Sequence, residues 1–217
     1  MTGDPLTAMS PNALQRRIEG CRICYERPTQ PQRLPHVPRP VLRISDTARL
    51  CIAGQAPGAR VHASGLPFDD RSGDRLREWM GVARDEFYDE RLVSFVPMGF
   101  CFPGYDAKGS DMPPRRECRA TWHDRVFAVM PQVELVLAIG AYAQRYHLGD
   151  RARPRMTETV LDWRAHLFRN ERPRVLPLPH PSWRNTGWLR ANPWFEADVV
   201  PALRREVGSL LTPTPAP

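Results

Sequence analysis

Lysine is nearly absent from this chain, and long apolar stretches are missing altogether. Of the 31 basic residues only Lys108 is a lysine, and the others are arginines. A mechanism that requires a Schiff-base lysine has one candidate, on a loop beside a glycine, and is disfavoured. No run of the roughly eighteen apolar residues that a membrane helix needs occurs, and residues 1–10 contain no hydrophobic signal region. The sequence therefore predicts a cytoplasmic protein with no membrane partner.

The composition is that of a basic globular domain. The 217 residues are 41% hydrophobic and carry a net charge of +7. A positive excess suits a polyanionic partner, because each neutralised phosphate releases counterions. The arginine bias has two explanations, a GC-rich genome that favours arginine codons or bidentate phosphate binding. We expect one monomeric domain over residues 1–211, with a flexible start (1–9), an extended proline-rich surface wrap (27–43) and a disordered tail (212–217).

The five cysteines do not suggest a disulfide framework in a cytoplasmic chain. Cys51 lies in an apolar run, where a small buried hydrophobic residue is expected. Four thiolates suit a 4Fe–4S cluster or a zinc ion, although a long second spacing fits a compact zinc ribbon poorly. Three alternatives stay open, a cluster, zinc or unliganded thiols, and the spacing favours the cluster. The four cysteines concerned form a C-x2-C pair and a C-x16-C pair: Cys21, Cys24, Cys101 and Cys118.

Short apolar runs alternate with amphipathic segments along the chain. Strands are predicted at residues 49–54, 93–98, 133–140 and 175–178, and Pro177 restricts the last one to a few residues or an edge. Helices are predicted at 11–20, 73–82, after Pro114, at 141–148, 156–166 and from 193 onward, where Pro201 should kink or restart the helix. This alternation predicts an α/β fold with a parallel sheet and helices on both faces.

Two loops leave predicted strands at the end where ligands bind in such folds. The first is residues 54–58 (GQAPG), followed by 65–68 (GLPF) and 72–73 (SG), and the second is residues 180–182 (HPS). Each loop alone is a weak signal, because glycine–proline turns are common and a histidine at a strand end is more often structural. Together they predict a ligand site.

These loops and the four paired cysteines resemble the uracil-DNA glycosylase superfamily, most closely its iron–sulfur families 4 and 5. Family 4 carries a G-E-A-P-G turn, a G-x-P-F segment, a serine- or alanine-glycine before a helix, a strand ending near a cysteine, and a closing H-P-S. Segments 54–58, 65–68, 72–73, 93–101 and 180–182 occupy these places in order, and the likeness extends from about Cys21 to Val207. The resemblance implies a three-layer αβα sandwich with a central four-stranded parallel sheet. It also implies a structural 4Fe–4S cluster held by Cys21, Cys24, Cys101 and Cys118.

The resemblance further implies a monofunctional glycosylase that starts base excision repair on uracil-containing DNA, single- or double-stranded. Such an enzyme hydrolyses the N-glycosidic bond of a flipped-out deoxyuridine. The catalytic positions are then His180, which donates to the uracil carbonyl O2, and Gln55, whose neighbouring backbone N–H assists. Phe68 either stacks on the flipped base or packs beneath the turn. The other implied substrate contacts are Gly54, His62, Asp70 and Ser182, and the implied DNA contacts are Pro57, Gly58, Trp183 and Arg184.

Two departures from the family 4 pattern, and one difference from a related branch, bear on the chemistry. Gln55 stands where a glutamate is thought to help the water, so Asp69, Asp70 and His62 become the candidates for orienting it. No asparagine occurs near Pro97, where the family reads the uracil edge. Residues 102–117 contain no histidine, so the covalent product bond of a related branch is not expected.

These departures leave alternatives to a uracil glycosylase. One is a glycosylase for another deaminated base, such as hypoxanthine. The other is a non-catalytic iron–sulfur DNA-binding module, in which Gln55 and Pro97 mark a dead site. The presence of both His180 and Phe68 favours a catalytic pocket, because a module that only binds DNA needs neither residue.

Overall fold

A computed structural model describes residues 9–212 of the chain. Its centre is a four-stranded parallel sheet in the order β2-β1-β3-β4, which confirms the predicted fold class and places the proline-containing strand at an edge. Apart from Met9 and Thr212, the expected flexible start and disordered tail lie outside the described residues. The strands are β1 (Leu50–Ala53), β2 (Val93–Phe95), β3 (Leu135–Ile139) and β4 (Arg174–Leu178).

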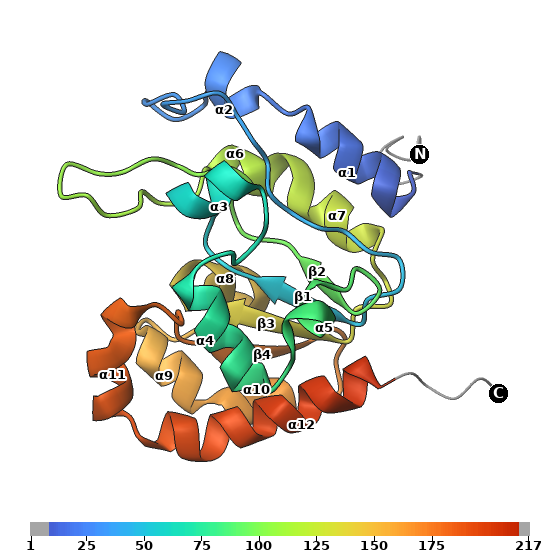
Figure 1. The fold of residues 1–217 in the computed structure, drawn as a ribbon, viewed down its shortest axis with the longest axis vertical. Coiled ribbons are helices and arrows are strands. Elements are labelled where there is room, and N and C mark those ends of the chain that lie inside the picture. The colour runs from blue at the N-terminus through green and yellow to red at the C-terminus, as the bar shows by residue number, and fades with distance from the viewer. Residues whose placement is uncertain (1–8, 213–217) are drawn as a thin grey trace.

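The strands are buried on both faces, and successive side chains enter two separate cores. In β1, Leu50 and Ile52 join the first core, whereas Cys51 and Ala53 join the second, because consecutive strand residues point to opposite faces. Helices cover both faces of the sheet, as Figure 1 shows. An all-parallel sheet needs this cover, since its strands are apolar throughout. The structure therefore has the three αβα layers that the sequence analysis expects.

Each core is closed by its own set of helices (Figure 1). The first core lies against α4 (Arg71–Met80), α5 (Arg84–Tyr88), α9 (Met156–Leu161), α10 (Trp163–Leu167), α11 (Thr186–Ala191) and α12 (Val200–Leu211). The second lies against α1 (Pro11–Glu19), α2 (Ile23–Glu26), α6 (Arg116–Cys118), α7 (Asp124–Ala128) and α8 (Gly140–Leu148). The remaining elements are α3 (Ala59–Ser64), the π-helical turns η1 (Arg119–His123) and η4 (Phe195–Val199), and the 3-10 turns η2 (Gly149–Arg151) and η3 (Trp183–Asn185).

Most helix boundaries follow local sequence signals. Ser10 caps α1, its hydroxyl accepting a hydrogen bond from Ala13 N at 3.3 Å. Pro201 lies in the first turn of α12, so it restarts the last helix. The helix expected over 156–166 is divided at Asp162 into α9 and α10. The sequence pattern does not predict α3, α5 and α11, because five or six residues are too few to show a helical period.

The proline-rich segment is extended, as expected, but it is not confined to the surface. Residues 27–42 form no helix or strand. Leu34 and Leu42 are nevertheless buried in the second core. The prediction of a purely superficial wrap is therefore wrong for these two side chains, because an extended backbone turns some of its side chains inward wherever it crosses an apolar face.

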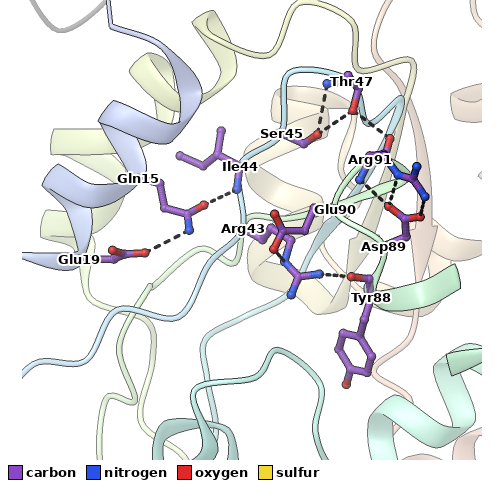
Figure 2. Close-up of polar contacts among 10 residues, drawn as sticks. All are labelled: Gln15, Glu19, Arg43, Ile44, Ser45, Thr47, Tyr88, Asp89, Glu90 and Arg91. Carbon is purple, nitrogen blue, oxygen red and sulfur yellow. Dashed lines mark hydrogen bonds and ion pairs between the residues drawn. The ribbon is translucent and has the colours of Figure 1, made fainter. Parts of the chain in front are cut away.

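Polar contacts at the end of this segment fasten it to α1 and to the last residue of α5 (Figure 2). Gln15 accepts a hydrogen bond from Ile44 N at 2.8 Å. Arg43 donates to the carbonyl of Tyr88 at 2.6 Å. Tyr88 is thereby fixed, and its hydroxyl in turn donates to Pro67 O at 2.9 Å.

Candidate active site and cysteine cluster

A pocket of about 590 Å³ lies beyond the carboxyl ends of β1 and β4. Both loops predicted from the sequence line it, and residues 103–111 add a wall that the sequence analysis does not predict. His62 is not among its lining residues and lies on α3 against His36, with the ring centroids 4.2 Å apart. The pocket brings together the other expected substrate and DNA residues: Gly54, Gln55, Pro57, Gly58, Phe68, Asp70, His180, Ser182, Trp183 and Arg184.

The turn after β1 is held by hydrogen bonds to neighbouring segments. The carbonyls of Gly54 and Gln55 accept hydrogen bonds from Met98 N and Gly99 N, each at 2.9 Å. The side chain of Gln55 donates to Met112 O at 3.2 Å. The amide of Gln55 is therefore engaged in anchoring the segment that walls the pocket, and it brings no charge to the site.

Phe68 stands in a backbone conformation that few side chains adopt. Its φ of +53° is the only positive value of a non-glycine residue within the described part of the chain, and such strain concentrates at functional sites. Gly54 lies under the ring, where an added Cβ would be 3.5 Å from Phe68 Cζ. The ring also packs at the edge of the first core, against Phe87 and Phe95. The sequence analysis gives two interpretations of Phe68, a ring that stacks on the base and a ring that packs beneath the turn. The ring contacts the core on one side and lines the pocket on the other.

His180 lies in the loop that leaves β4, and its hydrogen bonds determine which ring nitrogen carries the proton. Its Nδ1 lies 3.2 Å from Ser182 N, which donates to it. Because a backbone N–H can only donate, we assign the proton of the neutral ring to Nε2. Burial lowers the pKa of His180, against the opposing effect of Asp70 and Asp111. The loop is fixed by Asn185, whose Nδ2 donates to His180 O at 2.7 Å, so a neutral imidazole presents Nε2–H to the pocket.

The expected acidic residues differ in what they contact. Asp70 lines the pocket and also caps α4, its Oδ1 accepting a hydrogen bond from Gly73 N at 3.0 Å. Asp69 is not part of the lining and lies 3.6 Å from the guanidinium of Arg84. Of the three candidates for orienting water, Asp70 alone reaches the pocket.

Asp111 is a pocket residue that sequence reasoning missed. The residue is exposed at the surface, yet partial desolvation of its carboxyl raises the pKa of that group, against the opposing effect of Arg184. The signal that could have indicated this residue is a pair of nearby glycines, Gly104 and Gly109, both with positive φ. Such glycines are typical of a chain that folds back on itself, and the returning part of this segment brings Asp111 to the pocket.

Two aromatic side chains are exposed at the mouth of the pocket. Trp183 is 69% exposed and Tyr105 is 56% exposed, and the guanidinium carbon of Arg184 lies 5.8 Å from the Trp183 ring centroid. Trp188 packs instead against Trp194, with ring centroids 5.8 Å apart, so it does not bury Trp183. Exposed aromatic and arginine side chains suit stacking on nucleobases.

The four paired cysteines gather at one small apolar cavity, whereas Cys51 is buried elsewhere in β1. The neighbouring thiol of Cys118 lowers the pKa of Cys24 to about 7. Trp122 Nε1 donates to Cys21 Sγ at 3.4 Å. The cavity is lined by Cys21, Ile23, Cys24, Leu34, Pro38, Pro40, Phe100, Cys101 and Cys118.

The chemistry of this donor set fits a metal cluster. The four thiols come from three segments of the chain and form no disulfide, and thiolates are the soft ligands that iron–sulfur clusters and zinc prefer. Within residues 9–212, no group of three or more His, Cys, Asp or Glu side chains is spaced to hold a metal ion. The fit therefore rests on the donor chemistry and on the shared apolar cavity.

A buried ion pair joins the segments that carry the cysteines. Glu117 lies 2.7 Å from the guanidinium of Arg115 and accepts hydrogen bonds from Thr29 N at 2.9 Å and Gln30 Nε2 at 2.8 Å. Burial alone would raise the pKa of Glu117, but these bonds lower it to about 2. The carboxylate thereby ties the chain after α2 to the helix that contains Cys118.

Comparison with known families adds one finding. Residues 43–204, about three quarters of the chain, match the Uracil DNA glycosylase superfamily. The matched region contains all four strands, both pocket loops, Cys101 and Cys118, whereas Cys21 and Cys24 precede it. No helix in the described residues has the length and apolar character to cross a membrane.

Proposed function

This chain belongs to the uracil-DNA glycosylase superfamily, and from that premise we propose that it hydrolyses the N-glycosidic bond of flipped-out deoxyuridine in DNA. Membership of the superfamily supports a DNA glycosylase in general, with DNA as the substrate. The observation that carries the uracil proposal is the presence of Phe68 and His180 in one pocket. A planar apolar ring suits stacking on a pyrimidine, and an N–H donor suits its carbonyl oxygen.

Substrate capture begins with rotation of the nucleotide out of the base stack. This costs a few kcal/mol, which the pocket must recover. Arg60 and Arg71 line the pocket, where they can bind the phosphates on either side of the flipped nucleotide. Trp183 and Arg184 are placed to fill the gap that the base leaves in a duplex.

Bond breakage places negative charge on the base and positive charge on the sugar. The electron pair of the C1′–N1 bond leaves with the uracil, and a water oxygen adds to C1′. His180 Nε2–H donates to the uracil O2, where the charge collects, and a preorganised donor of this kind contributes roughly 3–4 kcal/mol. A neutral imidazole can do this because Ser182 N fixes the tautomer. The products are free uracil and an abasic site, with no net electron transfer.

The identity of the base that is removed leaves room for a second candidate function. No asparagine is among the residues that line the pocket in the described part of the chain. A side-chain amide that would read the uracil edge is therefore missing, and backbone groups must take its place. This absence is the observation that favours the second candidate, a glycosylase for another deaminated base such as hypoxanthine.

We also propose that the four paired cysteines hold a structural 4Fe–4S cluster, as in families 4 and 5. When bound, the cluster supplies a covalent cross-link between distant segments of the chain and takes no part in hydrolysis. Purified protein should then be brown, with broad absorption near ~400 nm and about four irons per chain. Cys24→Ala should bleach the protein, whereas Cys51→Ala should not, because Cys51 lies outside the shared cavity. Colourless protein with stoichiometric zinc would overturn the cluster assignment.

The function is tested on oligonucleotides that contain one uracil, hypoxanthine, xanthine or mispaired thymine. We expect release of free uracil and an abasic site that is cut only after alkali. Lys108→Ala should retain activity, since no lysine nucleophile is needed, and a borohydride-trapped adduct through Lys108 would contradict this. His180→Ala should lose about two to three orders of magnitude in single-turnover rate with little change in DNA affinity. Full activity of His180→Ala with a lower melting temperature would show that His180 is structural.

A further inference from the structure

The segment 103–112 folds back on itself and brings a carboxylate to the pocket. Within it, Tyr105 and Asp111 form an antiparallel bridge. Gln55 Nε2 donates to Met112 O at 3.2 Å, so the residue after Asp111 is fastened to the turn after β1. In Figure 1 this segment extends beside α3. Asp111 Oδ2 consequently lies close to the turn, 4.0 Å from the position that a Cβ on Gly58 would take.

The two carboxylates of the pocket are not equivalent. Asp70 uses Oδ1 to cap α4 through Gly73 N, so its position serves the helix. Asp111 makes no side-chain hydrogen bond to any residue of the described chain, and both of its oxygens are available to a ligand. Asp69 faces Arg84 outside the pocket. Of the two carboxylates in the pocket, Asp111 is therefore the one whose oxygens can both bind a ligand.

We infer that Asp111 binds and orients the water that attacks C1′, which makes it a catalytic residue of this pocket. The inference rests on the proposed glycosylase function and names the group that carries out one of its steps. Position 55, where the family 4 pattern has a glutamate, holds Gln55 in this chain, and its amide secures the segment that presents Asp111. The carboxylate is thus supplied from a different part of the chain.

The proposed step balances in atoms and charge. The C1′–N1 bond breaks and its electron pair leaves with the base, whose O2 accepts a hydrogen bond from His180. The water oxygen bonds to C1′, and the water proton passes to the Asp111 carboxylate. That proton then goes to the base anion or to solvent, which regenerates the carboxylate. While C1′ is electron-poor, the same carboxylate also stabilises its positive charge.

The charges around Asp111 suit this role. Arg184, which follows β4, attracts its anionic form, whereas Asp70 repels it. Partial desolvation opposes ionisation and raises the pKa of Asp111, which makes its carboxylate a stronger base than a free aspartate. A carboxylate strengthened as a base in this way can accept the proton of the attacking water.

The first test compares Asp111→Asn with Asp106→Asn in single-turnover uracil release. Asp111→Asn should be slower than wild type by about 100-fold, the lower end of the usual contribution of a general base. Asp106 is on the same segment, where its Oδ1 accepts hydrogen bonds from Lys108 N and Ser110 N. Asparagine preserves that acceptor while removing the same charge, so the rate of Asp106→Asn should stay within about twofold of wild type. Equal rates for the two variants would overturn the inference.

The second test measures DNA binding and does not depend on which base the enzyme removes. Fluorescence anisotropy compares an oligonucleotide that contains a cationic pyrrolidine abasic analogue with one that contains neutral tetrahydrofuran. Wild type and Asp106→Asn should prefer the cationic analogue by about tenfold, and Asp111→Asn should lose this preference. A preference that survives in Asp111→Asn would overturn the inference. If wild type shows the preference but releases no uracil, the uracil proposal fails and the role of Asp111 stands.

Protein stability separates this role from a structural one. Because folding raises the pKa of Asp111, the folded state favours the protonated carboxyl, and ionisation at neutral pH opposes folding. Removing the charge should therefore leave the melting temperature of Asp111→Asn equal to or above that of wild type. A lower melting temperature together with the slower rate would indicate a structural residue and contradict the inference.

Discussion

The carbonyl of Phe68 leaves no space for a side chain at position 73. A Cβ on Gly73 would lie 1.8 Å from Phe68 O, whereas ordinary contact begins at 3.4 Å, so the two segments would have to separate by the difference, about 1.6 Å. The obstacle is backbone, which cannot rotate away as a flexible side chain would. Gly73→Ala should therefore push Phe68 out of its strained conformation and away from the pocket.

The two effects of this substitution oppose each other in stability. Alanine favours a helix over glycine by about 1 kcal/mol, whereas overpacking typically costs about 1–3 kcal/mol. We expect a net loss of up to about 2 kcal/mol, which corresponds to a fall of at most about 4–8 °C in the melting temperature of a chain of this size. The rate should fall further, because a displacement of about 1 Å near the reacting atoms costs on the order of 100-fold.

The measurement is thermal unfolding together with single-turnover uracil release, with Gly208→Ala as the matched control. Gly208 lies inside α12, and a Cβ there would meet nothing within 4 Å. Gly208→Ala should raise the melting temperature slightly and leave the rate unchanged. If Gly73→Ala is as stable and as active as Gly208→Ala, the close approach at Phe68 does not determine the pocket.

Further predictions concern the supports of the two sites. Glu117→Ala should lower the free energy of unfolding by about 3–5 kcal/mol, because buried Arg115 loses its partner; an unchanged urea midpoint would contradict this. Tyr88→Phe removes the donor to Pro67 O and should cost about 1 kcal/mol, so an unaltered melting temperature would show that this bond is dispensable. Trp183→Ala should slow the reaction more on double-stranded than on single-stranded substrate, because only a duplex has a gap to fill; equal losses would refute a gap-filling role.

The sheet and two walls of the pocket could be predicted because their signals are local. Each strand is a short apolar run, and the turn at 54–58 and the loop at 180–182 follow two of these runs directly. The loops that follow parallel strands lie at the same end of the sheet. The fold class therefore predicts that the two loops are close to each other in space. The resemblance to a family then assigned roles to residues such as His180, and the matched family agrees with that resemblance.

The rest of the site depends on contacts between distant parts of the chain. Asp111 reaches the pocket because Gln55 anchors Met112, a bond between residues 57 positions apart. His62 is near the pocket turn in sequence, yet α3 carries it toward His36. No periodic pattern in the sequence predicts either the anchoring of Met112 or the position of His62. The same holds for Phe68, whose carbonyl approaches Gly73 of the following helix so closely that no side chain fits at position 73.

The order of the strands has a consequence for the newly made protein. The turn that carries Gln55 follows β1 and the loop that carries His180 follows β4, with β3 between these two strands in the sheet. During synthesis, a chain that has left the ribosome only as far as β3 holds one half of the pocket and lacks the other. Abasic sites are themselves lesions, and an enzyme that made them while incompletely folded would damage the genome it serves. Both halves of the pocket are therefore in place only once β4 has paired with β3.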